Sequence, residues 1–220
     1  MNKLPVSPSW FEQLHTVDLE YHFKWLAQLS GTVESIVDFG CWNSSEPFAL
    51  LWAVDATQVK VIEKEEKNLA EPREELERLR NINLGCLEGR SVEFVVADMS
   101  SMVAELPSDH FDLAYCENVL YFMQSDLPKV QEAINEMARV VRPGGWVIAI
   151  ETKIGAKFEE VVDEFASKLF GHTQTRFVRV SDPMDISELF RIARLVHYGL
   201  DGAPDWSYCY KKPSVPDATG

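Results

Sequence analysis

Acidic residues recur at the ends of short apolar segments along the first two thirds of this 220-residue chain. In an open parallel sheet the carboxyl ends of the strands meet at one edge, and ligands bind there. Carboxylates accept hydrogen bonds from hydroxyl and amino groups, and they attract cations. The pattern therefore favours a ligand with hydroxyl groups and positive charge. The acids expected at this edge are Asp38, Glu63, Asp98, Glu117 and Glu151.

The spacing between Gly40 and Glu63 suggests a nucleoside as part of that ligand. Glu63 follows Gly40 by 23 residues, close to the distance at which an acid after a second strand reaches the ribose of a nucleotide bound at the first turn. Nicotinamide dinucleotides and S-adenosylmethionine both contain such a ribose. Both cofactors therefore have to be considered.

The first turn argues against the dinucleotide. Residues 40–45 do not contain the GxGxxG pattern, and Glu46 lies where the next helix would hold a diphosphate. Two like charges about 4 Å apart repel by ~1 to 4 kcal/mol. S-adenosylmethionine has no phosphate and is cationic, so an acidic crevice suits it better. A nicotinamide-dependent reductase is the less favoured reading.

The elements that would position these acids alternate along the chain. Apolar runs predict strands over 36–39, 59–63, 92–98, 111–116 and 146–150, with helices over 46–54, 64–80, 99–106 and 127–141 between them. Helices near 158–169 and 186–193 precede runs at 195–200 and 206–210, whose short connection requires antiparallel neighbours. The expected fold is α/β: a doubly wound, seven-stranded, mostly parallel sheet with a C-terminal antiparallel hairpin.

The chain is expected to form a single domain over residues 1–220. Apolar residues recur at helical spacing before residue 30 and predict an N-terminal helical cap over 1–32, and residues 212–220 predict a flexible tail. No apolar run is long enough for a signal peptide or a transmembrane helix. The four cysteines lack CxxC or Cys/His spacing, so we expect reduced thiols and a cytoplasmic protein.

The charge balance narrows the choice of partner. Thirty-five acids against 21 Lys and Arg give a formal net charge of −14. That excess opposes binding to nucleic acid or to an anionic membrane. The histidines share no ligand spacing, so no metal site is predicted. A small-molecule substrate is the expected partner, and the oligomeric state is not predicted.

Several segments together carry a family resemblance. Residues 35–41, SIVDFGC, resemble the first motif of class I S-adenosylmethionine-dependent methyltransferases. Glu63, the segment 97–99 and the segment 111–115 fall where the later motifs of that family belong, and residues 136–145 are similar to its helix and turn before strand five. The resemblance covers roughly residues 33–152. It is to small-molecule enzymes of methyltransferase types 11 and 12, and it implies that family's fold, with a reversed seventh strand.

The resemblance also implies roles in cofactor binding. Gly40 with its neighbours would approach the methionine part of S-adenosylmethionine, and Glu63 would hold the ribose. Asp98 would accept from the adenine amino group. The cofactor-binding residues implied in this way are Asp38, Gly40, Cys41, Trp42, Glu63, Asp98, Met99, Glu117 and Asn118.

The first loop departs from the pattern, and two functions follow from it. Trp42 and Ser44 stand where the family usually has glycines, and Asn43 is the residue expected to take up a left-handed turn. If the loop still accepts the cofactor, the chain transfers methyl groups. If it does not, the chain is an inactive binding or scaffold protein on the same fold.

No catalytic residue is assigned from the sequence. In-line methyl transfer depends on positioning, and a base is needed only if the acceptor must lose a proton. The candidates are Tyr21, His22 and Tyr121. No NPPY-like tetrad follows the fourth strand, which argues against base methylation in nucleic acids and for a small organic acceptor.

Overall fold

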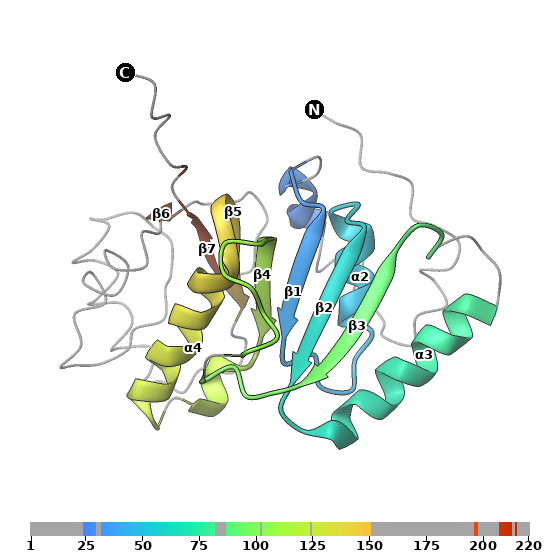
Figure 1. Cartoon of the computed structure of the whole chain (residues 1–220), viewed down its shortest axis with the longest axis horizontal. Coiled ribbons are helices and arrows are strands. Elements are labelled where there is room, and N and C mark those ends of the chain that lie inside the picture. Colours follow the sequence, from blue (N-terminus) through green and yellow to red (C-terminus); the bar gives the residue numbers. More distant parts are fainter. Residues whose placement is uncertain are drawn as a thin grey trace.

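Seven strands form one sheet at the centre of the chain (Figure 1). The computed structural model describes residues 24–29, 32–81, 87–101, 103–123, 125–150, 196–197, 207–212 and 214. The strands are β1 (Ser35–Phe39), β2 (Gln58–Glu63), β3 (Ser91–Val96), β4 (Phe111–Glu117), β5 (Val141–Ile150), β6 (Val196–His197) and β7 (Ser207–Lys211). Their order is β3-β2-β1-β4-β5-β7-β6.

Strand β7 alone runs against the others, since it pairs antiparallel with both β5 and β6. The remaining neighbours in the sheet are parallel. The predicted fold, with its C-terminal antiparallel pair, is confirmed. The carboxyl ends of β1 and β2 lie at the bottom of Figure 1, where their arrowheads point.

Helices cover both faces of the sheet. The described helical elements are η2 (Lys24–Leu29), α2 (Glu46–Ala53), η3 (Glu66–Leu69), α3 (Ala70–Asn81), η4 (Leu120–Met123) and α4 (Leu127–Val140). Residues of η2, α2 and α3 share one buried cluster with alternate residues of the strands, and residues of α4 and η4 share the other. Figure 1 shows α2 behind the strands and α4 on the viewer's side.

The alternation of side chains along each strand decides which residues pack on the same face of the sheet. Ile36 of β1 packs in the cluster on the α2 face, and Val37 packs in the cluster on the α4 face. Because side chains alternate along a strand, Asp38 lies on the α2 face. Its register partners Val61 and Tyr115 both belong to that cluster.

The helix expected over residues 99–106 is wrong. The described residues of this segment form turns, with short contacts such as Leu106 N–H to the Val103 carbonyl at 3.0 Å. Side chains of α4 supply the remaining partners: Glu136 accepts from the Val103 N–H at 3.0 Å, and Arg139 donates to the Leu106 carbonyl at 2.9 Å. Tertiary contacts thus satisfy backbone groups that a helix would have paired.

Strand β5 begins earlier than predicted, at Val141 rather than Trp146. The Pro143-Gly144-Gly145 segment lies within it, opposite a register shift between Phe111 and Leu113. A Cβ on Gly145 would come within 2.8 Å of the Asp112 carbonyl oxygen, so the two strands approach closely here. The sequence signals a turn at these residues, whereas the structure accommodates them as an irregular stretch of strand.

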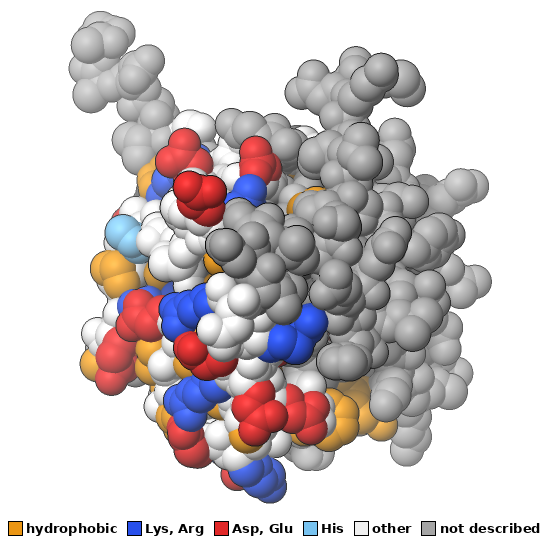
Figure 2. Space-filling model, turned by 90° about the vertical axis from the view of Figure 1, so that its right-hand side faces the viewer, with side chains coloured by type: hydrophobic (Ala, Val, Ile, Leu, Met, Phe, Trp, Pro, Cys, Tyr) orange, Lys and Arg blue, Asp and Glu red, His pale blue; other side chains and the backbone are white. Residues whose placement is uncertain are grey.

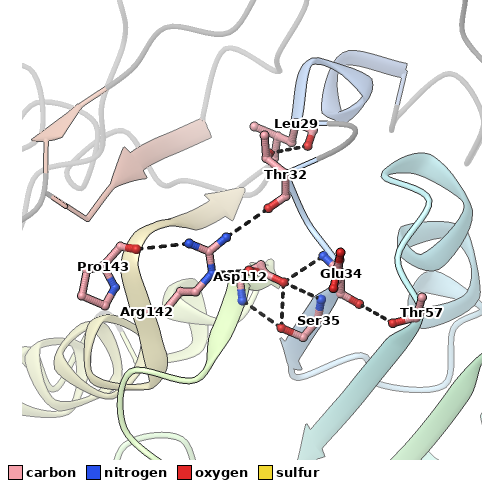
Figure 3. Close-up of polar contacts among 8 residues, drawn as sticks. All are labelled: Leu29, Thr32, Glu34, Ser35, Thr57, Asp112, Arg142 and Pro143. Atoms are coloured by element: carbon pink, nitrogen blue, oxygen red, sulfur yellow. Dashed lines mark hydrogen bonds and ion pairs between the residues drawn. The ribbon is translucent and has the colours of Figure 1, made fainter. Parts of the chain in front are cut away.

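A polar clamp on Asp112 joins the amino ends of three strands (Figure 3). The Asp112 carboxylate accepts from the N–H groups of Glu34 and Ser35, each at 2.8 Å, and it pairs with the Arg142 guanidinium. Arg142 also donates to the Thr32 carbonyl at 3.4 Å. The clamp lies at the edge of the sheet opposite to the predicted ligand site and has a structural role.

Several predictions fall on residues outside the described part. They concern most of the N-terminal cap, the helices at 158–169 and 186–193, and Glu151. Lys212, the first residue of the predicted tail, is described: its ammonium pairs with Asp109 at 2.6 Å and donates to the Val141 carbonyl at 2.8 Å. None of the described helices is both long and apolar enough to cross a membrane.

Candidate functional site

The loop from β1 to α2 starts with a glycine that touches the segment following β4. Gly40 has φ +82°, and a Cβ built on it would lie 2.5 Å from Cγ2 of Val119. Its N–H donates to the Ile62 carbonyl at 2.7 Å, which ties the loop to β2. Gly40 is therefore required for its conformation and for the close approach of a side chain from another strand end.

Trp42 occupies the left-handed region, with φ 49°. The sequence assigned that turn to Asn43, and this prediction is wrong. The turn forms one residue earlier because the Trp42 N–H donates to Glu63 at 3.1 Å while Ser44 folds back through its N–H and hydroxyl onto the Cys41 carbonyl. A non-glycine residue in this conformation costs ~1 to 2 kcal/mol. The indole itself is 65% exposed.

Glu63 ends β2 and is buried, as expected of an acid at this edge. Its carboxylate already accepts three internal hydrogen bonds: from the N–H groups of Trp42 at 3.1 Å and Glu65 at 3.0 Å, and from the Asn68 amide at 3.1 Å. A carboxylate offers about four acceptor positions. Glu63 therefore holds the first loop in place and retains capacity for about one more donor.

Asp98 lies two residues beyond the end of β3, not within the strand as predicted. Lys64 pairs with one of its oxygens at 2.8 Å, and the N–H and hydroxyl of Ser100 donate to the other at 2.9 and 2.7 Å. Partial burial acts to raise its pKa, but these donors outweigh burial and lower the pKa to about 2. Met99 follows with a buried side chain.

Asp38 and Glu46 face each other under the first turn of α2. Asp38 is 0% exposed, and apart from a neighbouring acid no described residue donates a hydrogen bond to its oxygens. The Glu46 carboxyl, itself 7% exposed, is placed to hydrogen-bond with it. Two ionised carboxylates cannot do so, because neither carries a hydrogen. One proton is therefore shared between the two acids.

The pKa of each acid follows from this setting. Burial raises the pKa of Asp38 to about 7; a hydrogen bond with Glu46 opposes the rise, and the negative charges of Glu117 and Glu63 add to it. Burial raises the pKa of Glu46 well above its usual range, and the charges of Asp38 and Glu117 raise it further. The hydrogen bond between the two acids raises the pKa of Glu46 and lowers that of Asp38, the directions expected when Glu46 donates and Asp38 accepts.

Two more groups complete this acid cluster of Asp38, Glu46, Glu117 and Tyr115. The Tyr115 hydroxyl donates to Glu117 at 3.0 Å, and burial raises the tyrosine pKa well above its usual range. Burial, followed by the nearby acids, likewise raises the pKa of the Cys41 thiol, so this cysteine is not a nucleophile. Among the described residues no cationic side chain acts on the pKa of Asp38 or Glu46.

The sequence did not identify Glu46 as part of this cluster. It treated Glu46 as a charged residue that repels a diphosphate at the helix terminus. The residue is indeed the first of α2, but it is buried and its burial raises its pKa well above the usual range, so repulsion by a permanently charged carboxylate does not describe its role. A signal was present: Glu46 opens an otherwise apolar helix of which every residue is buried.

The segment after β4 contains two further residues that the sequence predicted for the site, Asn118 and Tyr121. Asn118 is left-handed, with φ 56°, and its N–H donates to the Ile150 carbonyl at 2.7 Å. Tyr121 lies half-buried in η4 with its ring edge-to-face against Phe122, which is 77% exposed. The other two catalytic candidates, Tyr21 and His22, lie outside the described residues.

No group of three His, Cys, Asp or Glu side chains in the described ranges is arranged to hold a metal ion. The acid cluster therefore lacks the convergence that a divalent cation requires, although it is rich in carboxylates. Cys41, Cys116 and Cys209 are buried, and no disulfide joins them to one another. What the site offers is a group of buried acids beside the Gly40 loop, with the left-handed residues Trp42 and Asn118 in the two adjoining loops.

A family model described as a methyltransferase domain matches residues 37–149, just over half of the chain. The match begins within β1 and ends within β5, so it contains every described residue of the site. No curated protein sequence matches the chain.

Solved structures share the fold at low sequence identity. An S-adenosylmethionine-dependent methyltransferase from Clostridium acetobutylicum has a TM-score of 0.60 and 12% identity over 90% of this chain and 93% of its own. The pyocyanin biosynthetic protein PhzM has a TM-score of 0.55 and 18% identity, covering 89% of this chain and 55% of its own. The (4+2)-cyclase SpnF has a TM-score of 0.52 and 24% identity, covering 80% and 58%.

The present chain thus spans little more than half of the length of two of these three proteins. At such identities the structural likeness establishes the fold, and the family model establishes the family. The mostly parallel sheet with its reversed β7 agrees with both. The chain therefore belongs to the methyltransferase domain family and has the class I fold that its motifs predicted.

Proposed function

We propose that this methyltransferase binds S-adenosylmethionine at the carboxyl edge of β1, β2 and β4 and transfers its methyl group to a small organic acceptor. One observation supports the cofactor above others: Asp38 is fully buried beside the Gly40 loop, and among the described residues its one hydrogen-bonding neighbour is another acid, Glu46. A carboxylate in such a place is costly unless a cation joins it. The amino and sulfonium groups of S-adenosylmethionine supply positive charge.

The residues of the site fit this cofactor with two adjustments. When bound, S-adenosylmethionine supplies an electrophilic methyl group, and the chain's task is to bind, orient and exclude water. Glu63 has room for about one ribose hydroxyl, because three internal donors already occupy its carboxylate. Asp98 would have to share its oxygens with Lys64 and Ser100 to accept from adenine.

Isothermal titration calorimetry with S-adenosylmethionine tests the binding step. The parent protein is expected to bind one equivalent, and Glu63→Gln is expected to bind at least tenfold more weakly, because it loses a charged acceptor for a hydroxyl donor. Glu93→Gln is the matched control: Glu93 is an exposed acid of β3 that pairs with Lys60 at 3.1 Å. A folded parent protein that produces no binding heat would refute the proposal.

The small acceptor is proposed from the charge of the chain. A net charge of −14 opposes polyanionic substrates, and Figure 2 shows acidic and basic side chains interspersed over the described part of one face rather than a basic patch. Incubation with methyl-tritiated S-adenosylmethionine and a cell extract distinguishes the acceptors. Label is expected in the small-molecule filtrate, and label in the nucleic-acid or protein fraction would contradict the proposal.

A second candidate is an inactive binding or scaffold protein, and Trp42 favours it. The backbone of Trp42 is left-handed and strained, and Trp42 stands where the family usually has a glycine. If Trp42 obstructs the site, the parent protein does not bind S-adenosylmethionine and Trp42→Gly does. If the parent binds and Trp42→Gly changes its affinity less than threefold, the scaffold candidate is refuted. A cytoplasmic location and the absence of nucleic-acid and membrane partners stay predictions.

A further inference from the structure

Glu46 is an acid in a place where packing favours an apolar side chain. It is the first residue of α2, a helix whose eight residues are all buried. Its N–H donates to the Ser44 hydroxyl at 3.2 Å, and its carboxyl points into the cluster beneath the helix rather than into solvent. Burial of a carboxyl group in such surroundings is unfavourable unless the group has a function or a partner.

The partner of Glu46 is Asp38. Glu46 lies within hydrogen-bonding reach of both Asp38 and Glu117, and the Tyr115 hydroxyl donates to Glu117. Asp38 has no other donor among the described residues, and its hydrogen bond with Glu46 lowers the pKa of Asp38 and raises that of Glu46, as a bond donated by Glu46 would do. The hydrogen bond stabilises the charged form of Asp38 against the cost of burial.

The groups facing this pair come from every element around it. They are the Cys41 thiol in the loop, Glu63 on β2, and Tyr115 and Glu117 on β4. All of them are acids or neutral donors. The pair therefore has no internal cation among the described residues to neutralise it, and a bound cation would do so.

We propose that Glu46 is a positioning residue of the cofactor site: its protonated carboxyl donates to Asp38 and presents that side chain as an ionised carboxylate to the cationic group of the cofactor. This inference rests on the proposed function and extends it to a residue that no motif assigned. Binding then requires Asp38 in its charged form, so protonation of Asp38 competes with the cofactor.

The pH profile of binding tests the first part of the inference. Affinity of the parent protein for S-adenosylmethionine is expected to be about fivefold weaker at pH 6 than at pH 7, because the ionised fraction of Asp38 falls. The α-amino group of the ligand stays protonated over this range, since such groups titrate near pH 7.7 to 8.0. Asp38→Asn is expected to bind more weakly and with no dependence on pH between 6 and 7.

Two variants of Glu46 separate positioning from packing. Glu46→Gln keeps a donor toward Asp38 without a titratable proton, so its pH profile is expected to match that of the parent. Glu46→Leu fills a similar volume but removes the donor, so the fall in affinity is expected at a higher pH than in the parent. A role in packing alone would leave the midpoint of the profile in place in both variants. Thermal unfolding confirms that each variant is folded.

The outcomes discriminate this inference from the proposed function. The inference is supported if the parent binds with a pH-dependent affinity, Glu46→Gln keeps the pH profile of the parent, and the profile of Glu46→Leu moves to higher pH. Binding by the parent with the same affinity at pH 6 and pH 7, or equal profiles in both variants, overturns the inference and leaves the proposed function standing. A folded parent that does not bind at any pH overturns both.

Discussion

Asp38 has opposite effects on folding and on binding. In the folded chain burial raises its pKa from the usual 3.8 to about 7, so the folded state holds a proton that the unfolded state has already lost at pH 5. Where the folded state binds more protons, stability falls as the pH rises. The contribution of Asp38 is therefore most favourable below about pH 4 and is lost as the pH passes 7. The same carboxylate, once charged, provides the attraction for a cationic ligand.

Removing this charge is expected to stabilise the protein without ligand. Asp38→Asn should be more stable than the parent at pH 8, with a difference of at most about 4 kcal/mol in the free energy of unfolding. Between pH 8 and pH 5 the advantage should shrink, because the parent then buries a neutral acid. Urea unfolding at the two pH values measures it. An advantage of equal size at both would show that Asp38 is not the group that titrates.

At the scale of the elements, the site depends on loops that touch one another across strand ends. The loop after β1 is joined to β2 through Gly40 and Glu63, and the segment after β4 packs Val119 against Gly40. These contacts bring residues far apart in sequence to the same edge. A change at the glycine should therefore affect two loops together.

Two glycine variants measure this coupling. Gly40→Ala and Gly89→Ala both place a methyl group at positive φ, but only the first meets another side chain, because nothing lies within 4 Å of the Cβ at Gly89. Gly89→Ala should cost ~1 to 2 kcal/mol of stability from conformation alone. Gly40→Ala should cost about 1 to 3 kcal/mol more from overpacking and should weaken cofactor binding. Equal costs from urea unfolding would contradict the packing of Val119 on Gly40.

Elements that follow from a local pattern of apolar residues were predictable from the sequence. Features that depend on contacts with segments distant in the chain were not. The strands and the acids at their ends follow from short apolar runs, and β7 follows from a connection too short for a crossover. The helix expected at 99–106 failed because Glu136 and Arg139 of α4 satisfy its backbone groups. The role of Glu46 was missed because its burial depends on β1 and β4 lying beneath it.

The chain as a whole is strongly acidic, and its candidate site is acidic as well. Most of the net charge of −14 lies outside the acid cluster, on a surface where many acids pair with Lys or Arg, such as Glu66 with Arg73 and Glu77 with Arg80. Such exposed pairs add little stability. The net charge opposes binding of polyanions, and the proposed function assigns a small cationic ligand to the site.

Thermal unfolding with different ligands should report this selection. At a concentration 100 times its dissociation constant, S-adenosylmethionine should add about 2.7 kcal/mol to the stability of the folded state. For a chain of this size, the unfolding temperature should rise by roughly 5 to 10 °C. NADH at the same concentration should leave it unchanged. A larger rise with NADH would favour a nicotinamide-dependent reductase.

A crystal structure of the parent protein grown with S-adenosylmethionine shows whether the cofactor binds beside Asp38. We expect the ligand at the carboxyl edge beside Gly40, with a positively charged group facing Asp38 and the ribose near Glu63. Trp42 is expected to remain left-handed with its indole turned away from the ligand. Clear density for the ligand at any other place, or an indole that fills this edge while the ligand is absent at saturating concentration, would contradict this expectation.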